Sequence, residues 1–116
     1  MALVAQLVDD VVVHKFEVES DITFGRKLDN VVTIDDTSVS SYHAVLKVVP
    51  NPSFPDVTEY FIEDLGSTNG TELNGSKVIE PVQVHHGDTI TVAWNTFKFY
   101  DEGSQDLAKT THLVKD

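Results

Sequence analysis

The sequence predicts an all-β fold, an antiparallel β-sandwich, and three observations support this. Short segments rich in Val, Ile, Thr and aromatic residues recur along the chain, and Gly, Pro, Asn, Asp or Ser bound each of them. Nothing between these segments is long enough for a crossover helix of about ten residues, which a parallel sheet needs. Several segments alternate in polarity, which is typical of strands with one buried face.

Nine segments carry the strand pattern: residues 2–8, 11–18, 21–25, 31–35, 42–49, 59–65, 77–84, 88–94 and 96–101. In residues 42–49, the alternation places Ala44 and Leu46 on one face of the strand. Near the end of the pattern, Trp94, Phe97 and Phe99 are expected in the core, because large aromatic side chains contribute most when they are buried.

Two stretches interrupt the strands. Residues 50–58 hold three of the four prolines, which cannot donate to a sheet ladder, so this stretch is expected to be a loop. From residue 102 the sequence turns polar and loses its alternation. We therefore expect one domain over residues 1–101, followed by a polar tail or linker over residues 102–116.

The charge balance excludes several classes of partner. The chain has 19 acidic and 8 basic residues, a formal net charge of −11, and Arg26 is its one arginine. Binding to nucleic acid or to an anionic membrane needs a basic patch, and no cluster of lysines and arginines occurs. No apolar run approaches the roughly 20 residues of a membrane span, and no secretory signal is recognisable, so a cytoplasmic protein is expected.

Metal and cofactor sites are not predicted either. The chain has no cysteine. Adjacent His85 and His86 lack a further ligand at suitable spacing, so a turn is expected there. Asp35 and Asp36 lack the glycine and terminal glutamate of a calcium loop, and a solvated turn is again expected.

Two Asn-Gly dipeptides lie five positions apart, at Asn69-Gly70 and Asn74-Gly75. Asn-Gly is a strong hairpin signal, because both residues tolerate the positive φ angles of tight turns. Each dipeptide also matches the pattern of an N-glycosylation acceptor, but nothing else indicates secretion. Turns are therefore favoured, although turn chemistry leaves the hydroxyl residues just before Asn69 unexplained.

Two further loops are unusually polar. Arg26 follows a glycine at the end of one predicted strand, and several hydroxyl residues, Ser40 and Ser41 among them, precede the strand that begins near His43. Loops of a sandwich cluster at its two ends, so these loops can converge with the one that holds Asn69 if their strands leave at the same end.

Four ordered blocks now support a resemblance: FGR at residues 24–26, VSSYHA at 39–44, DLGSTNGT at 64–71 and NG at 74–75, followed by HGDTITV at 86–92. The chain resembles a forkhead-associated (FHA) domain, a module that recognises phosphothreonine, over roughly residues 1–101. Each block alone is a weak signal, but their order and spacing together are specific.

The resemblance implies a role for each residue at a matching position. Arg26 and Ser40 would contact the phosphate, Thr68 would help to hold the phosphothreonine, and Asn69 would hydrogen-bond the peptide backbone. Many relatives carry basic or amide residues after the binding serine, whereas this chain has Ser41 there, whose hydroxyl can still donate a hydrogen bond.

Other matching positions are expected to support the loops. Gly25 and His43 are architectural in the family, with His43 bracing the binding loops. Gly70 would be needed for its positive φ, and Asn74-Gly75 would remain a hairpin turn.

The predicted function is therefore a phosphothreonine-peptide binding module that acts as a signalling adaptor or docking domain, without a cofactor. Because the chain is strongly acidic, its partners are expected to be basic around the phosphothreonine, or to be tethered in the same chain or complex. Thr110 or Thr111 in the tail could be captured by the chain's own site after phosphorylation, as in some members of the family.

Two other classes of function remain as alternatives. One is a phosphate-independent interaction or oligomerisation module that associates through a sheet face. The other is an enzyme, which is disfavoured because Ser40 and His43 lack a third group to orient the histidine.

Overall fold

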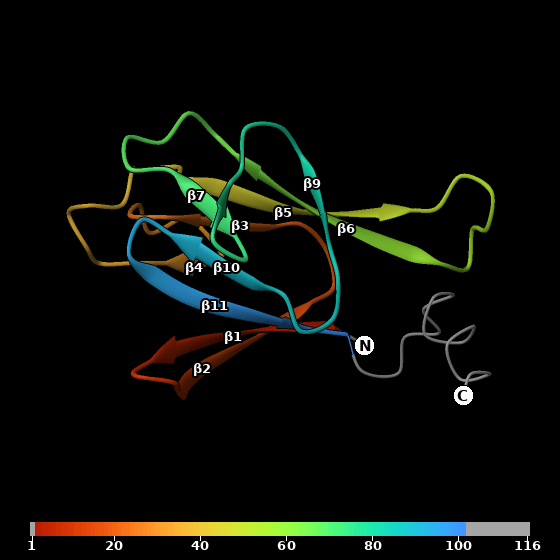
Figure 1. The fold of residues 1–116 in the computed structure, drawn as a ribbon, viewed down its shortest axis with the longest axis horizontal. Helices are drawn as coiled ribbons and strands as arrows, with labels where there is room; N and C mark the ends of the chain where they lie inside the picture. Colours follow the sequence, from red (N-terminus) through yellow and green to blue (C-terminus); the bar gives the residue numbers. More distant parts are fainter. Residues whose placement is uncertain (1, 102–116) are drawn as a thin grey trace.

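The computed structural model describes residues 2–101, which form two facing β-sheets (Figure 1). The six-stranded sheet has the order β2-β1-β11-β10-β7-β8. The bounds of its strands, in that order, are Val11–Val18, Ala2–Val8, Asn95–Tyr100, Thr89–Val92, Thr71–Leu73 and Ser76–Lys77. The five-stranded sheet has the order β4-β3-β5-β6-β9. Its strands are Val32–Thr33, Ile22–Gly25, Ala44–Pro50, Thr58–Asp64 and Val82–Val84.

The predicted all-β sandwich is confirmed, with one difference in strand direction. Every pair of neighbouring strands is antiparallel except β3 and β4, which run parallel through Phe24 opposite Val32 and Gly25 opposite Thr33. The predicted strand over residues 77–84 is also wrong in its middle. The segment from Val78 to Pro81 is not part of a strand. It connects two short strands, β8 and β9, which belong to different sheets.

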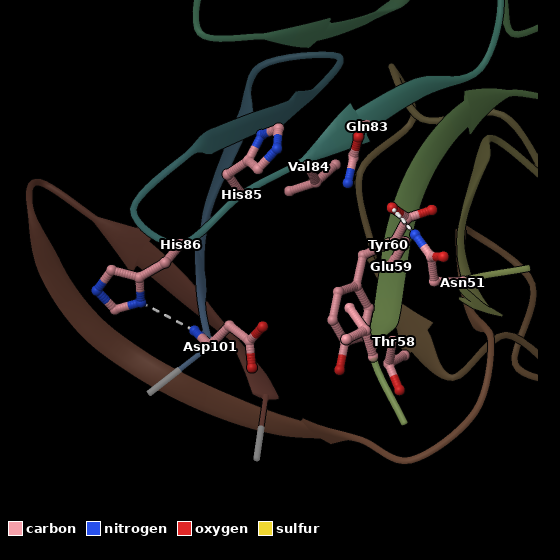
Figure 2. A pocket seen from close by; sticks show the side chains of 10 residues that line it. Asn51, Thr58, Glu59, Tyr60, Gln83, Val84, His85, His86 and Asp101 are labelled. Carbon is pink, nitrogen blue, oxygen red and sulfur yellow. Dashed lines mark hydrogen bonds between the residues drawn. The ribbon is translucent and has the colours of Figure 1, made fainter. Parts of the chain in front are cut away.

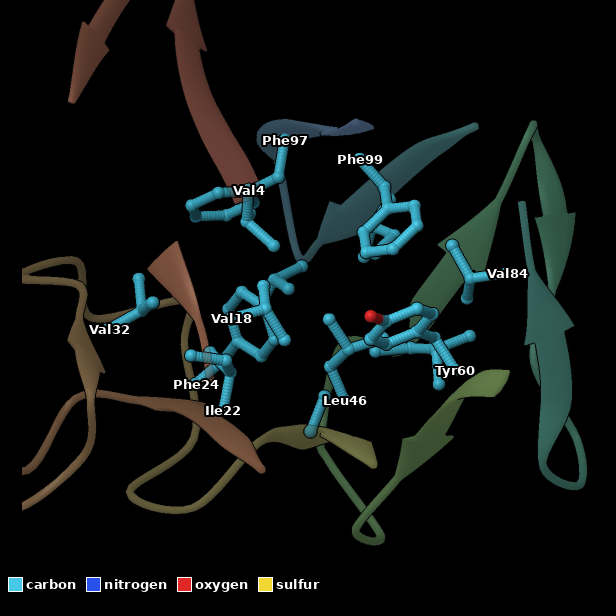
Figure 3. Close-up of a cluster of buried hydrophobic side chains, with 14 of the residues drawn as sticks. Val4, Val18, Ile22, Phe24, Val32, Leu46, Tyr60, Val84, Phe97 and Phe99 are labelled. Atoms are coloured by element: carbon cyan, nitrogen blue, oxygen red, sulfur yellow. The ribbon is translucent and has the colours of Figure 1, made fainter. Parts of the chain in front are cut away.

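The core lies between the two sheets and is built around aromatic side chains (Figure 3). Phe24 of the five-stranded sheet meets Phe97 of the six-stranded sheet edge-on, with ring centroids 5.2 Å apart. Tyr60 and Phe99 make a second contact between the sheets, at 4.9 Å. Burying each of these rings stabilises the fold by roughly 1.5 to 3 kcal/mol, so the two pairs hold the sheets together.

Trp94 corrects the sequence prediction, because it is 72% exposed whereas Phe97 and Phe99 are fully buried. The register explains the difference. Val92 pairs with Asn95, so Ala93 and Trp94 form a two-residue turn rather than the end of a strand. The sequence analysis had instead predicted that both residues belong to a strand over residues 88–94.

The hairpin between β7 and β8 has the turn that the sequence predicts. Leu73 pairs with Ser76, and the two residues between them are Asn74, with a φ of 51°, and Gly75, with a φ of 84°. Positive φ at both central residues defines a turn whose twist matches that of the flanking strands. Across residues 2–101, no helix is long and apolar enough to cross a membrane.

Candidate functional site

Three loops meet at one end of the sandwich, drawn on the left of Figure 1. They connect β3 to β4, β4 to β5 and β6 to β7. Backbone hydrogen bonds join the first two loops, since Arg26 N donates to Ser40 O at 3.0 Å and Lys27 N donates to Ser41 O at 3.3 Å. The loops that the sequence singled out therefore do lie together.

A depression of about 330 Å³ lies between these loops. It brings together all five residues expected to contact a phosphopeptide, and its full lining is Arg26, Thr37, Ser38, Val39, Ser40, Ser41, Thr68 and Asn69. Most of these side chains offer N–H or O–H donors, and none is acidic. In a chain of net charge −11, such a cluster of donors suits an anionic ligand.

Arg26 is exposed, but one edge of its guanidinium is fixed. Its Nε donates to Val39 O at 3.0 Å. Among the described residues, no acceptor is hydrogen-bonded or ion-paired to its two terminal nitrogens. The guanidinium is thus held in place while its outer donors remain able to take ligand oxygens, an arrangement that suits a phosphate.

Gly25 permits the close approach of the first two loops. A Cβ at this position would collide with Ser41 O and would lie 2.6 Å from Asn30 Nδ2. Asn30 is buried, and its Nδ2 donates to Lys27 O at 2.8 Å and to Ser41 O at 2.9 Å. The absence of a side chain at Gly25 therefore leaves room for the amide that joins the loop of Arg26 to Ser41.

Ser40 links the second loop to the third. Its Oγ accepts a hydrogen bond from Thr68 N at 3.0 Å. An acceptor bond of this kind leaves the hydroxyl proton of Ser40 available to donate. Asn69 makes a second link, since its Nδ2 donates to Ser38 O at 2.7 Å.

His43 is fully buried beneath the loops and bridges two of them. Its Nδ1 accepts a hydrogen bond from Ser40 N at 3.0 Å, and its Nε2 lies 2.8 Å from Gly70 O. A carbonyl oxygen only accepts, so this geometry assigns the proton to Nε2 in a neutral imidazole. Gly70 has a φ of 84°, a conformation that a side chain would disfavour.

Asp64 supports the third loop, a role that the sequence analysis missed. Its carboxylate accepts from Gly66 N and Ser67 N at 3.0 Å, from Ser67 Oγ at 2.6 Å and from Thr71 Oγ1 at 2.7 Å. Ser67 Oγ in turn accepts from Gly70 N at 2.9 Å. Ser67 is one of the hydroxyl residues before Asn69 that turn chemistry left unexplained, and with Thr71 it shapes the loop around one carboxylate.

The hydrogen bonds to Asp64 also change its pKa. Burial pushes the pKa of the carboxyl upward, but bonds from the Ser67 and Thr71 hydroxyls and from the backbone N–H groups of Ser67 and Gly66 outweigh it. The pKa of Asp64 is therefore below its ordinary value, and the carboxylate stays ionised. An Asp two residues before Gly-Ser is the local signal that could have revealed this loop motif.

Ser41 and Tyr42 follow Ser40, the serine that the resemblance assigns to the phosphate. Ser41 lines the depression. Tyr42 Oη donates to Asp29 Oδ2 at 2.9 Å, and this bond raises the pKa of the tyrosine. Tyr42 therefore braces the loop between β3 and β4 from outside.

A second depression, of about 150 Å³, lies away from these loops and is lined by residues of β6, β9 and the chain around them (Figure 2). His85 and His86 lie beside it but act separately. His85 Nδ1 is 3.9 Å from Asp88 Oδ2, whereas His86 Nδ1 accepts from Asp101 N at 2.9 Å. The predicted turn is observed at His86, and the described residues contain no group of three potential metal ligands.

Comparison with known proteins agrees with this architecture. The family model of the FHA domain matches residues 22–93, which include every loop of the site. The chain belongs to the FHA domain family. Domains of this family are binding modules.

The chain is 32% identical over 96 residues to the human proliferation marker protein Ki-67, a match that covers 83% of this chain but 3% of Ki-67. The FHA domain of CT664 from Chlamydia trachomatis superimposes with a TM-score of 0.76 at 21% identity, covering 88% of this chain and 98% of that one. Mycobacterium tuberculosis EmbR, solved in complex with a low-affinity phosphopeptide, gives a TM-score of 0.71 at 25% identity, covering 85% of this chain and 24% of EmbR.

Proposed function

We propose that this FHA domain binds phosphothreonine peptides and docks their proteins. The observation that carries the proposal is the depression lined by Arg26, Ser40, Ser41, Thr68 and Asn69. A phosphate dianion presents several strong acceptors, and these residues present a guanidinium, hydroxyls and an amide at one place. The complex of EmbR with a phosphopeptide supports the same use of the fold.

Each residue has a distinct part in the proposed site. The terminal nitrogens of Arg26 and the hydroxyl of Ser40 bind phosphate oxygens, and Ser41 adds a further hydroxyl donor. Thr68 contacts the phosphothreonine, while Asn69 binds the adjoining peptide backbone. No group in this set needs to exchange a proton or form a covalent bond, so the proposed site binds without catalysing a reaction.

An oriented phosphothreonine peptide library tests this function. Wild-type protein should select phosphothreonine peptides over the same sequences unphosphorylated. Arg26→Ala should lower the affinity by about 10- to 100-fold, because a charge-assisted hydrogen bond contributes roughly 1.5 to 3 kcal/mol. Lys15→Ala, which removes an exposed cation from the middle of β2, is the matched control and should bind as the wild type does.

The same experiment separates the alternative function. Association through a sheet face would survive Arg26→Ala and Ser40→Ala and would not depend on phosphorylation. Equal binding of phosphorylated and unphosphorylated peptides would contradict the proposed function and favour that alternative.

Capture of the chain's own tail is a further part of the proposal. Thr110 and Thr111 lie outside the described residues, and Thr110 is nine positions after Asp101 in the sequence. Nine extended residues span up to about 30 Å, and the six residues of β11, which lead away from the site, span about 20 Å. The tail is therefore long enough to return to the loops.

Kinase treatment followed by NMR tests self-capture. Phosphorylation at Thr110 or Thr111, located by mass spectrometry, should shift the signals of Arg26 and Asn69 without added peptide and at any protein concentration. Unchanged signals in the phosphorylated protein would rule out self-capture and leave binding to other proteins untouched.

A further inference from the structure

The second depression has no part in the proposed phosphopeptide site. It lies at the start of β6 and at the ends of β9 and β11, whereas the third loop of the candidate site follows the end of β6 (Figure 1). The two depressions are therefore at opposite ends of the sandwich. A ligand of the second one would be independent of a bound phosphopeptide.

Tyr60 brings an unused hydroxyl to the second depression. Its side chain is only 9% exposed, and its ring packs against Phe99 in the core. Its Oη has no hydrogen-bond partner among residues 2–101, although the side chain lines the depression (Figure 2). Polar groups of side chains buried to this degree nearly always have a partner. The hydroxyl is thus available to a ligand atom.

Asp101 brings a negative charge to the same space. Figure 2 shows its carboxylate and the hydroxyl of Tyr60 directed toward one opening. Burial, and then the charge of Asp101, raise the pKa of Tyr60 above its ordinary value, so the hydroxyl stays protonated and lies within reach of that charge. The residues that line the depression include no lysine or arginine. The carboxylate therefore favours a positively charged ligand.

The remaining lining suits a cation with an apolar stem. Thr58 is two residues before Tyr60 on β6, so its hydroxyl is on the same face of the strand. Val84 pairs with Tyr60 across the strands, and Val57 also lines the depression. Three oxygen acceptors match in number the three donors of an ammonium group, and the valines can pack against an alkyl chain. A volume of about 150 Å³ has room for roughly five or six non-hydrogen atoms.

We propose that this depression binds the ammonium group of a lysine side chain, with Asp101, Tyr60 and Thr58 as its acceptors. The inference goes beyond the proposed function and does not depend on it. The lysine can belong to another protein or to this chain's own tail, where Lys109 and Lys115 lie outside the described residues. A chain of net charge −11 attracts basic segments of either kind.

Titration of the full chain with n-butylammonium chloride, followed by NMR, tests the site, because this ion is the end of a lysine side chain without its backbone. The experiment is run at about pH 8, where an ordinary histidine is uncharged. The backbone signals of Gln83, Val84 and Asp101 should shift and saturate, with a dissociation constant of about 1 to 50 mM. Equal concentrations of n-butanol, sodium butyrate and sodium chloride are the controls and should leave these signals in place.

Two conservative variants test the acceptors. Asp101→Asn should weaken n-butylammonium binding about tenfold, because it loses a charge-assisted hydrogen bond. Tyr60→Phe removes one oxygen and should weaken binding about three- to tenfold. Its midpoint in urea denaturation should match that of the wild type, because the hydroxyl has no partner in the folded domain. A hydroxyl with a structural role would lower that midpoint.

Asp9→Asn is the matched control for the charge. Asp9 is exposed on the turn between β1 and β2, and Leu3 of β1 pairs with Tyr100, so the far end of β1 places Asp9 away from the depression. Its φ of 52° is one that asparagine tolerates. This variant should bind n-butylammonium as the wild type does.

A variant with both Lys109→Ala and Lys115→Ala identifies the source of the lysine. If the tail occupies the site, this variant should bind n-butylammonium more tightly, and its signals at Gln83 and Val84 should differ from those of the wild type before any probe is added. If the lysine comes from another protein, the affinity and these signals should be unchanged. Either result supports the site provided that Asp101→Asn weakens binding.

Three results would overturn the inference. The first is a shift that does not saturate or that n-butanol reproduces, and the second is tighter binding of butyrate, which would give the site the opposite charge preference. The third is n-butylammonium binding that Asp101→Asn and Asp9→Asn leave equally strong. Arg26→Ala should bind n-butylammonium normally, so failure of this site and failure of the phosphopeptide site are distinguishable.

Discussion

The two Asn-Gly dipeptides show how one sequence motif acquires two structural roles. Gly70 and Gly75 both have a φ of 84°. Asn74 has a positive φ as well, and its side chain ties the hairpin to the start of β10, accepting from Thr89 N at 2.9 Å. Asn69 has no positive φ, and its amide instead joins two loops of the binding end.

The difference shows that Asn-Gly fixes the glycine conformation while the surroundings decide what the asparagine does. Each dipeptide also lies near an organising carboxylate, since Asp64 shapes the loop of Asn69 and Asp88 accepts from Asn74 Nδ2 at 3.1 Å. Four predictions can break or sharpen this comparison, from the largest expected effect to the smallest.

Asp64→Ala should cause the greatest loss of stability. Four donors lose their acceptor at once, and we expect the free energy of unfolding to fall by about 3 kcal/mol in urea denaturation. Phosphopeptide affinity should fall too, because the loop of Asn69 loses its shape. Asp88→Ala is the matched control and should cost about 1 kcal/mol with affinity intact. Equal losses for the two variants would contradict the comparison.

Asn69→Ala should affect binding more than stability. We expect phosphopeptide affinity to fall about tenfold, since the amide holds Ser38 O and, in the proposed site, also binds the peptide backbone. The free energy of unfolding should change by less than about 1 kcal/mol, because Asn69 is exposed. Calorimetric titration and urea denaturation of the same preparation measure both. A variant with normal affinity would remove Asn69 from the proposed site.

Asn74→Ala should show the reverse pattern, with stability lowered by about 1 to 2 kcal/mol and affinity unchanged. The alanine loses two side-chain hydrogen bonds and must adopt a positive φ. Asn74→Gly separates the two causes, because glycine accepts the turn conformation and loses only the amide. Should Asn74→Ala weaken peptide binding, the two dipeptides would not be functionally distinct.

The smallest expected effect is a pH dependence. The pKa of Asp64 is lowered in the folded protein, so its contribution is present above the unfolded pKa of about 3.9 and is lost as pH falls through the folded pKa. The stability difference between wild type and Asp64→Asn should therefore be constant from about pH 7 to pH 5 and shrink below about pH 4. A difference that grows on acidification would have the wrong sign.

Much of the fold follows from local patterns. The long strands β1 and β2 were predicted because strand-forming residues such as valine are concentrated in them, and the burial of Phe97 and Phe99 was predicted because they are large aromatic residues. For the three loops, the sequence showed only that they could meet if their strands leave the sandwich at the same end. Alternation along one strand does not say which end of the sandwich a neighbouring strand leaves from.

Other features depend on tertiary pairing and were missed. Ala93 and Trp94 lack turn chemistry, so the turn that exposes Trp94 is visible only from the pairing of Val92 with Asn95. Asp64 does end β6, but its role as an acceptor was missed, because its four donors reach it only after the loop has folded back. Residues 102–116 lie outside the described residues, so the domain boundary expected near residue 101 stays a prediction.

The bridge made by His43 has a consequence for kinetics. Because its ring ties Ser40 N to Gly70 O from a fully buried position, the entropy of ordering these two loops is lost when the protein folds and not when a ligand arrives. Association should then approach the rate set by diffusion and electrostatics, and differences among ligands should appear in how long each one stays bound.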